Sequence, residues 1–254
     1  MTEPIQVSRQ DGLMEIKFNR PDRKNALSNE MYNRLTELFE QANRDDDIRC
    51  LLITGAGDAF TAGNDLQEFL SDPPVRDDAP VFRMLRALAA NEKILIAAVN
   101  GLAVGIGTTM LLHCDLVLAV SGTRFQLPFI NLAIVPEAAS SLLLPRLIGH
   151  QRTMELLLLG EPFYAEAAYS YGLVNRIVSA EELIQMSHSI VKQILQKPFK
   201  ALQLLKRLTA EDTKVILARM HMENAALGAQ IASAEGKEAV AALMEGRPPK
   251  FSWN

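Results

Sequence analysis

The chain has 254 residues, of which 48% are hydrophobic and 22% are charged, and this composition favours one globular domain with a large core. A formal net charge of -4 argues against nucleic-acid binding, because phosphate contacts need a clustered excess of Lys and Arg. No apolar run reaches the roughly 20 residues of a membrane span, and neither end carries a leader pattern or a peroxisomal address. We therefore expect a soluble, cytoplasmic protein that uses no membrane, with Cys50 and Cys114 as reduced thiols inside apolar runs.

The first half of the chain alternates predicted strands with predicted helices. Residues 13–18 alternate apolar and polar side chains as a half-buried strand does, and residues 19–22 have the composition of a turn. Ser28 is a good N-cap for a helix whose apolar face runs from Met31 to Ala42. Short runs rich in β-branched residues predict three buried strands, at residues 50–54, 94–99 and 115–120.

The second half is almost wholly helical. Only residues 173–178 read as a strand, and the Pro- and Asp-rich residues 71–80 predict a mobile surface loop. Helices are predicted at residues 137–148, 151–159, 165–171 and 181–196, with two more before Gly246. The order of elements predicts an α/β core over residues 1–195, followed by a C-terminal helical module over residues 196–254.

Two glycine-containing segments connect a predicted strand to a predicted helix, at residues 60–69 and 100–110. Free backbone N–H groups at two such helix starts could hold one oxyanion, although two ordinary tight turns would give the same pattern. Residues 55–60 invite a dinucleotide-binding interpretation, but Phe60 stands where the third glycine is needed. No Rossmann site is therefore expected.

Other common catalytic patterns are absent from the sequence. It has no Gly-x-Ser-x-Gly elbow, no Walker loop and no His or Cys pair at metal-ligand spacing. The four histidines are scattered, so we expect surface or helical positions for His113, His150, His188 and His221. The sequence predicts neither a metal nor a separate cofactor.

Four ordered motifs, at residues 19–27, 60–66, 98–105 and 165–174, resemble the crotonase (enoyl-CoA hydratase/isomerase) superfamily along nearly the whole chain. The resemblance implies a spiral of ββα turns and an acyl-CoA thioester as the substrate. It also implies that the backbone amides of Asn64 and Ile106 form the oxyanion hole, where each donor contributes about 3 kcal/mol to stabilising an enolate.

The same resemblance implies a coenzyme A (CoA) site and an oligomer. It puts Arg23 and Lys24 near the CoA phosphates, where the alternative is an ordinary solvated turn. The C-terminal module would make a homotrimer or a dimer of trimers, with Lys250 near a neighbour's CoA or in a disordered tail. The loop expected against the CoA adenine includes Ala62, Gly63, Asp65 and Leu66.

The carboxylates point to the type of reaction. Hydratases of this superfamily use two glutamates, and at the matching positions this chain has Thr109 and Phe129, neither of which can transfer protons as a carboxylate does. Glu137, after Pro136, reads by itself as the start of a helix. Its segment, however, resembles the peroxisomal-type Δ3,Δ2-enoyl-CoA isomerases, in which the matching glutamate is the catalytic base.

A single base suffices for this isomerisation, which removes a proton at C2 and returns one at C4. Apolar neighbours such as Ile134 and Val135 should raise the pKa of Glu137 by desolvation, and Phe129 would line the acyl pocket or belong to the core. Two alternatives remain open: a hydratase-like enzyme that uses Glu137 with water, and a non-catalytic acyl-CoA-binding module. The sequence favours the isomerase.

Overall fold

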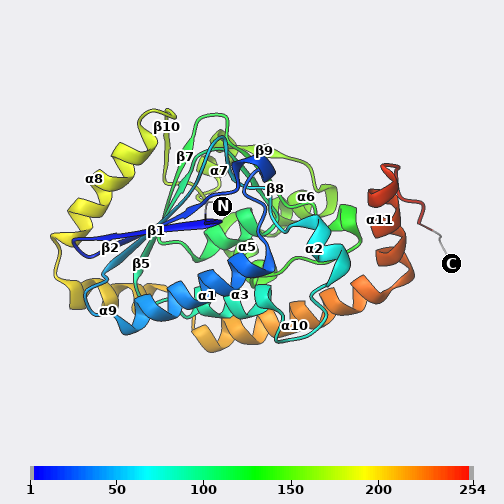
Figure 1. Ribbon diagram of the computed structural model, residues 1–254, viewed down its shortest axis with the longest axis horizontal. Coiled ribbons are helices and arrows are strands. Elements are labelled where there is room, and N and C mark those ends of the chain that lie inside the picture. Colours follow the sequence, from blue (N-terminus) through cyan, green and yellow to red (C-terminus); the bar gives the residue numbers. More distant parts are fainter. Residues whose placement is uncertain (1–2, 252–254) are drawn as a thin grey trace.

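Two β-sheets lie at the centre of the computed structural model, which describes residues 3–251 (Figure 1). The terminal residues 1–2 and 252–254, considered above for targeting signals, lie outside the described part. The larger sheet has the strand order β1-β2-β3-β5-β7-β10, antiparallel between β1 and β2 and parallel elsewhere. Its strands are β1 Ile5–Gln10, β2 Leu13–Phe18, β3 Cys50–Gly55, β5 Ile94–Val99, β7 Leu116–Val120 and β10 Arg176–Val178.

The four buried or half-buried strands predicted at β2, β3, β5 and β7 are confirmed. The strand expected at residues 173–178 is shorter, because the amides of Leu173 and Val174 bond back to the carbonyl of Ala168 at the end of a helix. Strand β1 lies at the sheet edge with mostly exposed side chains, so its sequence lacks the alternation that would have predicted it.

The smaller sheet has the order β4-β6-β8-β9. Its strands are β4 Ala59–Thr61, β6 Leu102–Val104, β8 Arg124–Gln126 and β9 Phe163–Tyr164, each too short to leave a periodic signal in the sequence. The pairs β3/β4, β5/β6 and β7/β8 each give one strand to each sheet, and helical segments follow each pair. This repetition confirms the predicted α/β class and is the ββα repeat expected from the resemblance.

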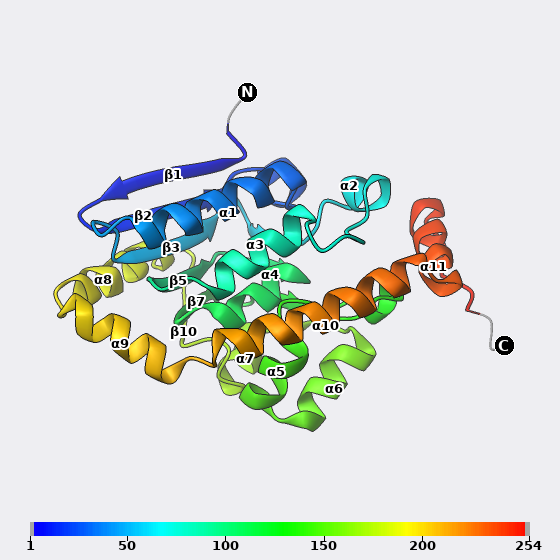
Figure 2. The same ribbon diagram turned by 90° about the horizontal axis from the view of Figure 1, so that it is seen from below.

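Helices cover the larger sheet and surround the smaller one (Figures 1 and 2). In α1, the Ser28 side chain accepts a hydrogen bond from the Met31 amide at 3.3 Å, which confirms the predicted cap. The other helices are α2 Leu66–Ser71, α3 Pro80–Ala89, α4 Ile106–Thr109, α5 Ser140–Ile148, α6 His150–Leu159, α7 Ala165–Ser170, α8 Leu183–Leu195, α9 Phe199–Thr209, α10 Thr213–Ala232 and α11 Ala234–Glu245, with α1 at Asn29–Arg44. Short 3-10 helices are η1 Pro21–Arg23, η2 Met110–His113 and η3 Ile130–Leu132.

Several helix boundaries differ by one to three residues from the sequence expectation, and two of them have a clear local cause. Pro80, assigned to the loop at residues 71–80, is the first residue of α3, a position that its fixed φ suits. Helix α5 begins at Ser140 rather than residue 137, because Ala138 and Ala139 have φ values of 63° and 54° in the left-handed region. The interpretation of Glu137 as a helix-start residue is therefore wrong.

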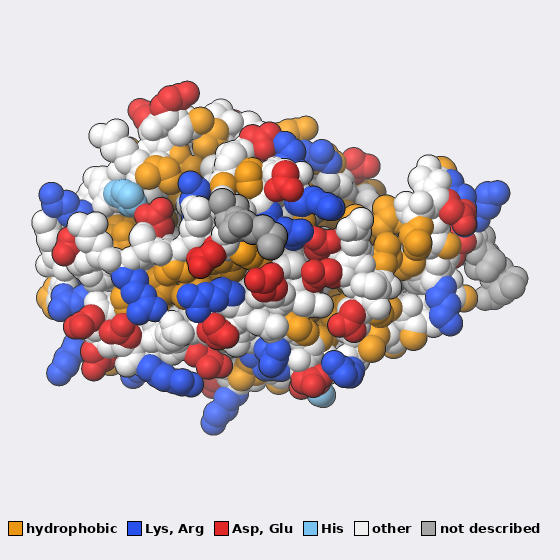
Figure 3. Space-filling view, viewed as in Figure 1, with side chains coloured by type: hydrophobic (Ala, Val, Ile, Leu, Met, Phe, Trp, Pro, Cys, Tyr) orange, Lys and Arg blue, Asp and Glu red, His pale blue; other side chains and the backbone are white. Residues whose placement is uncertain are grey.

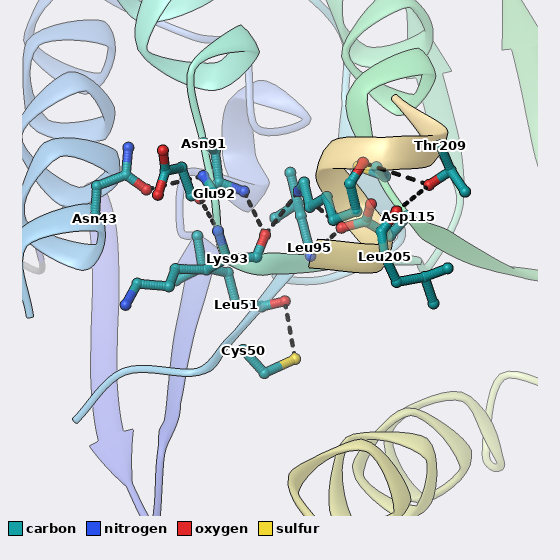
Figure 4. A network of polar contacts seen from close by, with 12 residues as sticks. Asn43, Cys50, Leu51, Asn91, Glu92, Lys93, Leu95, Asp115, Leu205 and Thr209 are labelled. Atoms are coloured by element: carbon teal, nitrogen blue, oxygen red, sulfur yellow. Dashed lines mark hydrogen bonds and ion pairs between the residues drawn. The ribbon is translucent and has the colours of Figure 1, made fainter. Parts of the chain in front are cut away.

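Three helices rather than two follow residue 196, namely α9, α10 and α11. Helix α9 is held against the core by Lys206, whose Nζ donates to Asp115 at 2.8 Å and to the Lys93 carbonyl at 2.7 Å. Figure 4 shows this region, where Asp115 also accepts from the Leu95 amide and the Asn91 side chain bonds the Lys93 backbone. Helix α10 runs beside α3 and α5, and α11 projects from the far end (Figure 2).

The division at residue 195 falls in the connection between α8 and α9, and a separate C-terminal module stays a prediction. Among residues 3–251, no helix combines the length and the apolar character that crossing a bilayer requires.

Candidate active site

A cavity of about 410 Å³ opens between the loop after β4, the loop after β6 and the segment around η3. This volume suits a small-molecule ligand, and its lining is mostly apolar. Residues from both glycine-containing segments line it, and Leu243 of α11 closes its far side. Figure 3 shows hydrophobic side chains gathered on the side of α11 that faces the rest of the molecule.

The two glycine-containing segments meet at the rim of this cavity. Gly63 has a φ of 91°, and a Cβ atom built there would lie 2.8 Å from the carbonyl oxygen of Val104. Only glycine permits this approach, because an added side chain would clash with the backbone of the other segment. Both segments therefore present their next residues, Asn64 and Ile106, to the same cavity.

The backbone amides of these two residues are available to a ligand. Ile106 is the first residue of α4, so its N–H is one of those that a helix leaves without an internal acceptor. Within residues 3–251, the neighbouring amides of Ala62 and Asp65 bond to the carbonyls of Lys24 and Leu27, whereas the Asn64 amide has no such bond. The arrangement leaves two donors at one cavity, and their role as an oxyanion hole stays a prediction.

Glu137 lies behind the lining, 4% exposed, in the connection between η3 and α5. Its Oε1 accepts a hydrogen bond of 2.6 Å from the Thr109 hydroxyl in α4, and its Oε2 has no hydrogen-bond partner among the described residues. Burial raises the pKa of Glu137 to about 8, and the Thr109 hydrogen bond opposes this shift. Ile134, three residues earlier, lines the cavity directly.

The backbone beside Glu137 is strained. Left-handed conformations at two consecutive alanines, Ala138 and Ala139, cost on the order of 1 kcal/mol each unless contacts impose them. The Ala138 carbonyl accepts a hydrogen bond of 2.8 Å from Nε2 of His113. Burial lowers the pKa of His113 to about 4, so its ring is neutral near pH 7 and donates that proton.

Glu223 of α10 supplies the other contacts of this segment. Its Oε2 accepts from the Ala139 amide at 2.6 Å, and its Oε1 accepts from the Ser141 amide at 2.9 Å and from the Ser141 hydroxyl. Ala139 offers no side chain to cap α5, so the Glu223 carboxylate caps that helix instead. Burial raises the pKa of Glu223, and its hydrogen bonds to Ser141 and Ala139 lower it.

Tyr32 contacts the site next to Asn64. The hydroxyl of Tyr32 in α1 donates to Oδ1 of Asn64, which fixes the side chain next to the free amide. Burial raises the pKa of Tyr32, and the negative charge of Glu137 adds to that shift. Tyr32 and Glu137 are therefore close enough to influence one another electrostatically.

Most residues expected at the CoA site line the cavity, and one does not. Lys24 lies outside the lining and pairs with Asp58, with Nζ 2.6 Å from the carboxylate. Asp65 caps α2 through the Gln67 amide and pairs with Arg20 at 2.9 Å, so its side chain shapes the loop. The predicted residues in the lining are Arg23, Ala62, Gly63, Asn64, Asp65, Leu66, Ile106 and Phe129.

Sequence reasoning did not identify Tyr32, His113 or Glu223 as site residues. Glu223 bonds a segment more than 80 residues away, and no short-range pattern predicts such a contact.

The other three histidines lie on helices with exposed side chains, as expected. Cys50 and Cys114 are free thiols, and burial raises the pKa of each to about 12, so both are unreactive. Among residues 3–251, no group of His, Cys, Asp or Glu is arranged to hold a metal ion.

Comparison with known proteins agrees with this geometry. The profile described as Enoyl-CoA hydratase/isomerase matches residues 8–254. A 1,2-epoxyphenylacetyl-CoA isomerase of Escherichia coli (strain K12) is 35% identical, over 99% of both chains. A crotonyl-CoA hydratase of Syntrophomonas wolfei is 33% identical over 98% of both chains, and the peroxisomal enoyl-CoA delta isomerase 3 of Mus musculus is 32% identical over 87% of this chain and 75% of its own.

The fold comparison leads to the same family. The crystal structure of an enoyl-CoA hydratase/isomerase from Pseudoalteromonas atlantica T6c is 40% identical and superposes with a TM-score of 0.93, covering 98% of this chain and 100% of the other. The expected crotonase-type fold is thereby confirmed. This chain belongs to the enoyl-CoA hydratase/isomerase family, within the crotonase superfamily.

Proposed function

We propose that the protein is a Δ3,Δ2-enoyl-CoA isomerase, which converts a 3-enoyl-CoA into the trans-2-enoyl-CoA by a single-glutamate proton shuttle. The observation that carries the proposal is the buried carboxyl of Glu137, with one oxygen bonded to Thr109 and the other without a hydrogen-bond partner among residues 3–251. The positions of the two hydratase glutamates are occupied by Thr109 and Phe129. A threonine and a phenyl ring leave no second proton-transfer group for adding water.

In this mechanism the thioester carbonyl accepts hydrogen bonds from the amides of Asn64 and Ile106. Glu137, as the carboxylate, removes a proton from C2, and the negative charge moves onto the thioester oxygen, where the two amides stabilise it. Glu137 then returns the same proton to C4 of the dienolate, and the double bond of the product lies between C2 and C3. Glu137 returns to the carboxylate, so atoms and charge balance without a cofactor.

The surroundings of Glu137 suit a proton shuttle. A carboxyl whose pKa is raised to about 8 is a stronger base than an exposed glutamate, and its burial slows exchange with solvent. Activity should rise with pH as the carboxylate forms. The acyl-CoA would lie along the cavity from Arg23, and its acyl group would extend toward Ile134, beside Glu137.

The test compares purified wild-type protein and Glu137→Gln on 3-hexenoyl-CoA and on crotonyl-CoA, with absorbance reporting the conjugated thioester formed or consumed. We expect isomerisation of 3-hexenoyl-CoA by wild type only, with a loss of at least 100-fold in the variant, and little hydration of crotonyl-CoA. Rapid crotonyl-CoA hydration would instead favour the hydratase-like alternative. Tight binding of CoA esters without turnover would favour the non-catalytic module.

Oligomeric state also belongs to this proposal. We propose a homotrimer or a dimer of trimers, with the helical C-terminus at the interface. Large apolar side chains on α9 and α10 are exposed in the single chain, among them Leu208 at 84% and Met222 at 63%. Lys250, whose amide donates to Glu238 within α11, would then lie near a neighbour's CoA. Sedimentation or light scattering measures the assembly directly.

A further inference from the structure

We propose that Glu223, on α10, is a positioning residue that holds Glu137 in its reactive place by fixing the strained segment between Glu137 and α5. This inference rests on the proposed function for its kinetic part. The chain separation between the two glutamates means that the C-terminal helices, rather than only the two sheets, build the reacting centre.

Contacts from two other elements fix the backbone between Glu137 and α5. Two consecutive left-handed alanines, at 138 and 139, are unfavourable, and a conformation of this kind persists only where surrounding contacts impose it. Glu223 supplies three of those contacts, through the amides of Ala139 and Ser141 and the Ser141 hydroxyl. His113 supplies a fourth through the Ala138 carbonyl. We call these four contacts, from Glu223 and His113 to residues 138–141, the clamp. The clamp fixes the backbone next to the Glu137 carboxyl.

Position 223 needs a carboxylate. The clamp requires acceptors for three donors at once, and a carboxylate has only acceptor oxygens. A glutamine of the same shape has one acceptor oxygen, and its NH₂ group would face an N–H donor. The Glu223 side chain is 5% exposed, so water cannot readily replace a missing acceptor.

The charge of Glu223 also affects Glu137. The pKa of Glu137 responds to the Thr109 hydroxyl from α4 and to Glu223 from α10, while Glu137 raises the pKa of Tyr32 in α1 and neutral His113 of η2 bonds the neighbouring Ala138 carbonyl. Of these, the Glu223 carboxylate contributes negative charge, which raises the pKa of Glu137 further after burial has done so. Arg219, on the same helix, partly compensates the charge of Glu223. Glu223 therefore affects the pKa of Glu137 as well as its position.

The experiment compares wild type with Glu223→Gln and Glu223→Asp on 3-hexenoyl-CoA across pH. We expect Glu223→Gln to lower kcat at least tenfold with KM within about twofold, and to move the acid limb of the kcat profile to lower pH. Glu223→Asp keeps the charge but shortens the reach, so kcat should fall while the acid limb stays in place. If Glu223→Gln does not fold, Glu223→Asp still decides, because an unchanged kcat there overturns the proposal.

A second readout needs no turnover, so it separates this inference from the proposed function. The difference in unfolding free energy between chains with and without Glu137→Gln changes with pH until the folded-state pKa of Glu137 is passed. We expect the pH at which this difference levels off to be lower in the Glu223→Gln background, because that variant lacks the negative charge of Glu223. A loss of melting temperature with kcat, pH profile and levelling-off pH all unchanged would mean that Glu223 only caps α5, and would overturn the proposal.

Discussion

Glu137 illustrates what a sequence can indicate about one residue and what it cannot. Its apolar neighbours predicted a carboxyl with a raised pKa, and the structure agrees, because burial raises the pKa of Glu137 to about 8. The left-handed conformation of Ala138 and Ala139 was not predictable, because alanine has no intrinsic preference for it. Contacts from distant helices impose that conformation, and only the folded chain brings them together.

The raised pKa of Glu137 predicts a pH-dependent stability. Between about pH 4.5 and 8 the unfolded chain releases this proton while the folded chain keeps it, so rising pH destabilises the fold. The loss is on the order of 5 kcal/mol above pH 8. Glu137→Gln should therefore gain stability relative to wild type between pH 5 and pH 9, as measured by denaturant unfolding.

The exposed Glu181 offers the matched control for that measurement. Glu181→Gln should change stability equally at pH 5 and pH 9, because the side chain is surrounded by solvent in the folded chain as in the unfolded chain. A Glu137→Gln difference that is the same at the two pH values would show that Glu137 has an ordinary pKa.

Thr109 provides a kinetic prediction at the same scale. Thr109→Val removes the hydroxyl that stabilises the Glu137 carboxylate, and a hydrogen bond to a charged group contributes about 1.5–3 kcal/mol. We expect kcat at pH 7 to fall about tenfold or more and the acid limb of the kcat profile to move to higher pH. Thr108→Val is the control, since the Thr108 hydroxyl bonds only backbone carbonyls, and its pH profile should not move.

At the scale of elements, the longer strands and amphipathic helices were predictable and the short ones were not. Strands β2, β3, β5 and β7 carry alternation or continuous apolar runs, and α1 carries a clear cap and apolar face. The three-residue strands β4, β6 and β8 have no such signal, although they present the cavity loops.

The attachment of α9 to the core predicts a stability difference between two neighbouring side chains. Lys206 is 12% exposed and bonds both Asp115 and the Lys93 carbonyl, whereas the neighbouring pair Arg207–Glu92 is 59% and 49% exposed. Lys206→Met should lower the free energy of unfolding by about 2 kcal/mol, because Asp115 loses its cationic partner in a half-buried site and the Lys93 carbonyl loses one of its two donors. Arg207→Met should cost less than about 0.5 kcal/mol. Equal losses in urea unfolding would contradict this account of the attachment.

At the scale of the whole molecule, the cavity joins parts of the chain that the sequence keeps far apart. The N-terminal loops supply its polar rim, η3 supplies its wall, and Leu243 of α11 supplies its far side. The resemblance correctly indicated the family, the α/β fold and the loops, because those depend on local motifs. It gave no indication that α10 would cap the segment of Glu137 or that α11 would line the cavity.

This arrangement predicts that α11 affects how tightly the acyl chain of the substrate binds. Leu243→Glu introduces a charge into the apolar far side of the cavity and should raise KM more for a 12-carbon than for a 6-carbon enoyl-CoA, by about tenfold. Met244→Glu is the matched control, because Met244 is 71% exposed and lies outside the lining. Similar effects of the two substitutions would exclude Leu243 from the acyl site.

The single-base shuttle is the central claim, and a label-transfer measurement tests it most directly. 3-Hexenoyl-CoA carrying deuterium at C2 is converted in a single turnover with excess enzyme, and the product is analysed for deuterium at C4. A buried Glu137, 4% exposed, should carry the label from C2 to C4 faster than it exchanges with water, so C4 is partly deuterated. A product with no deuterium at C4 would contradict the account, because it would require a second proton donor or solvent.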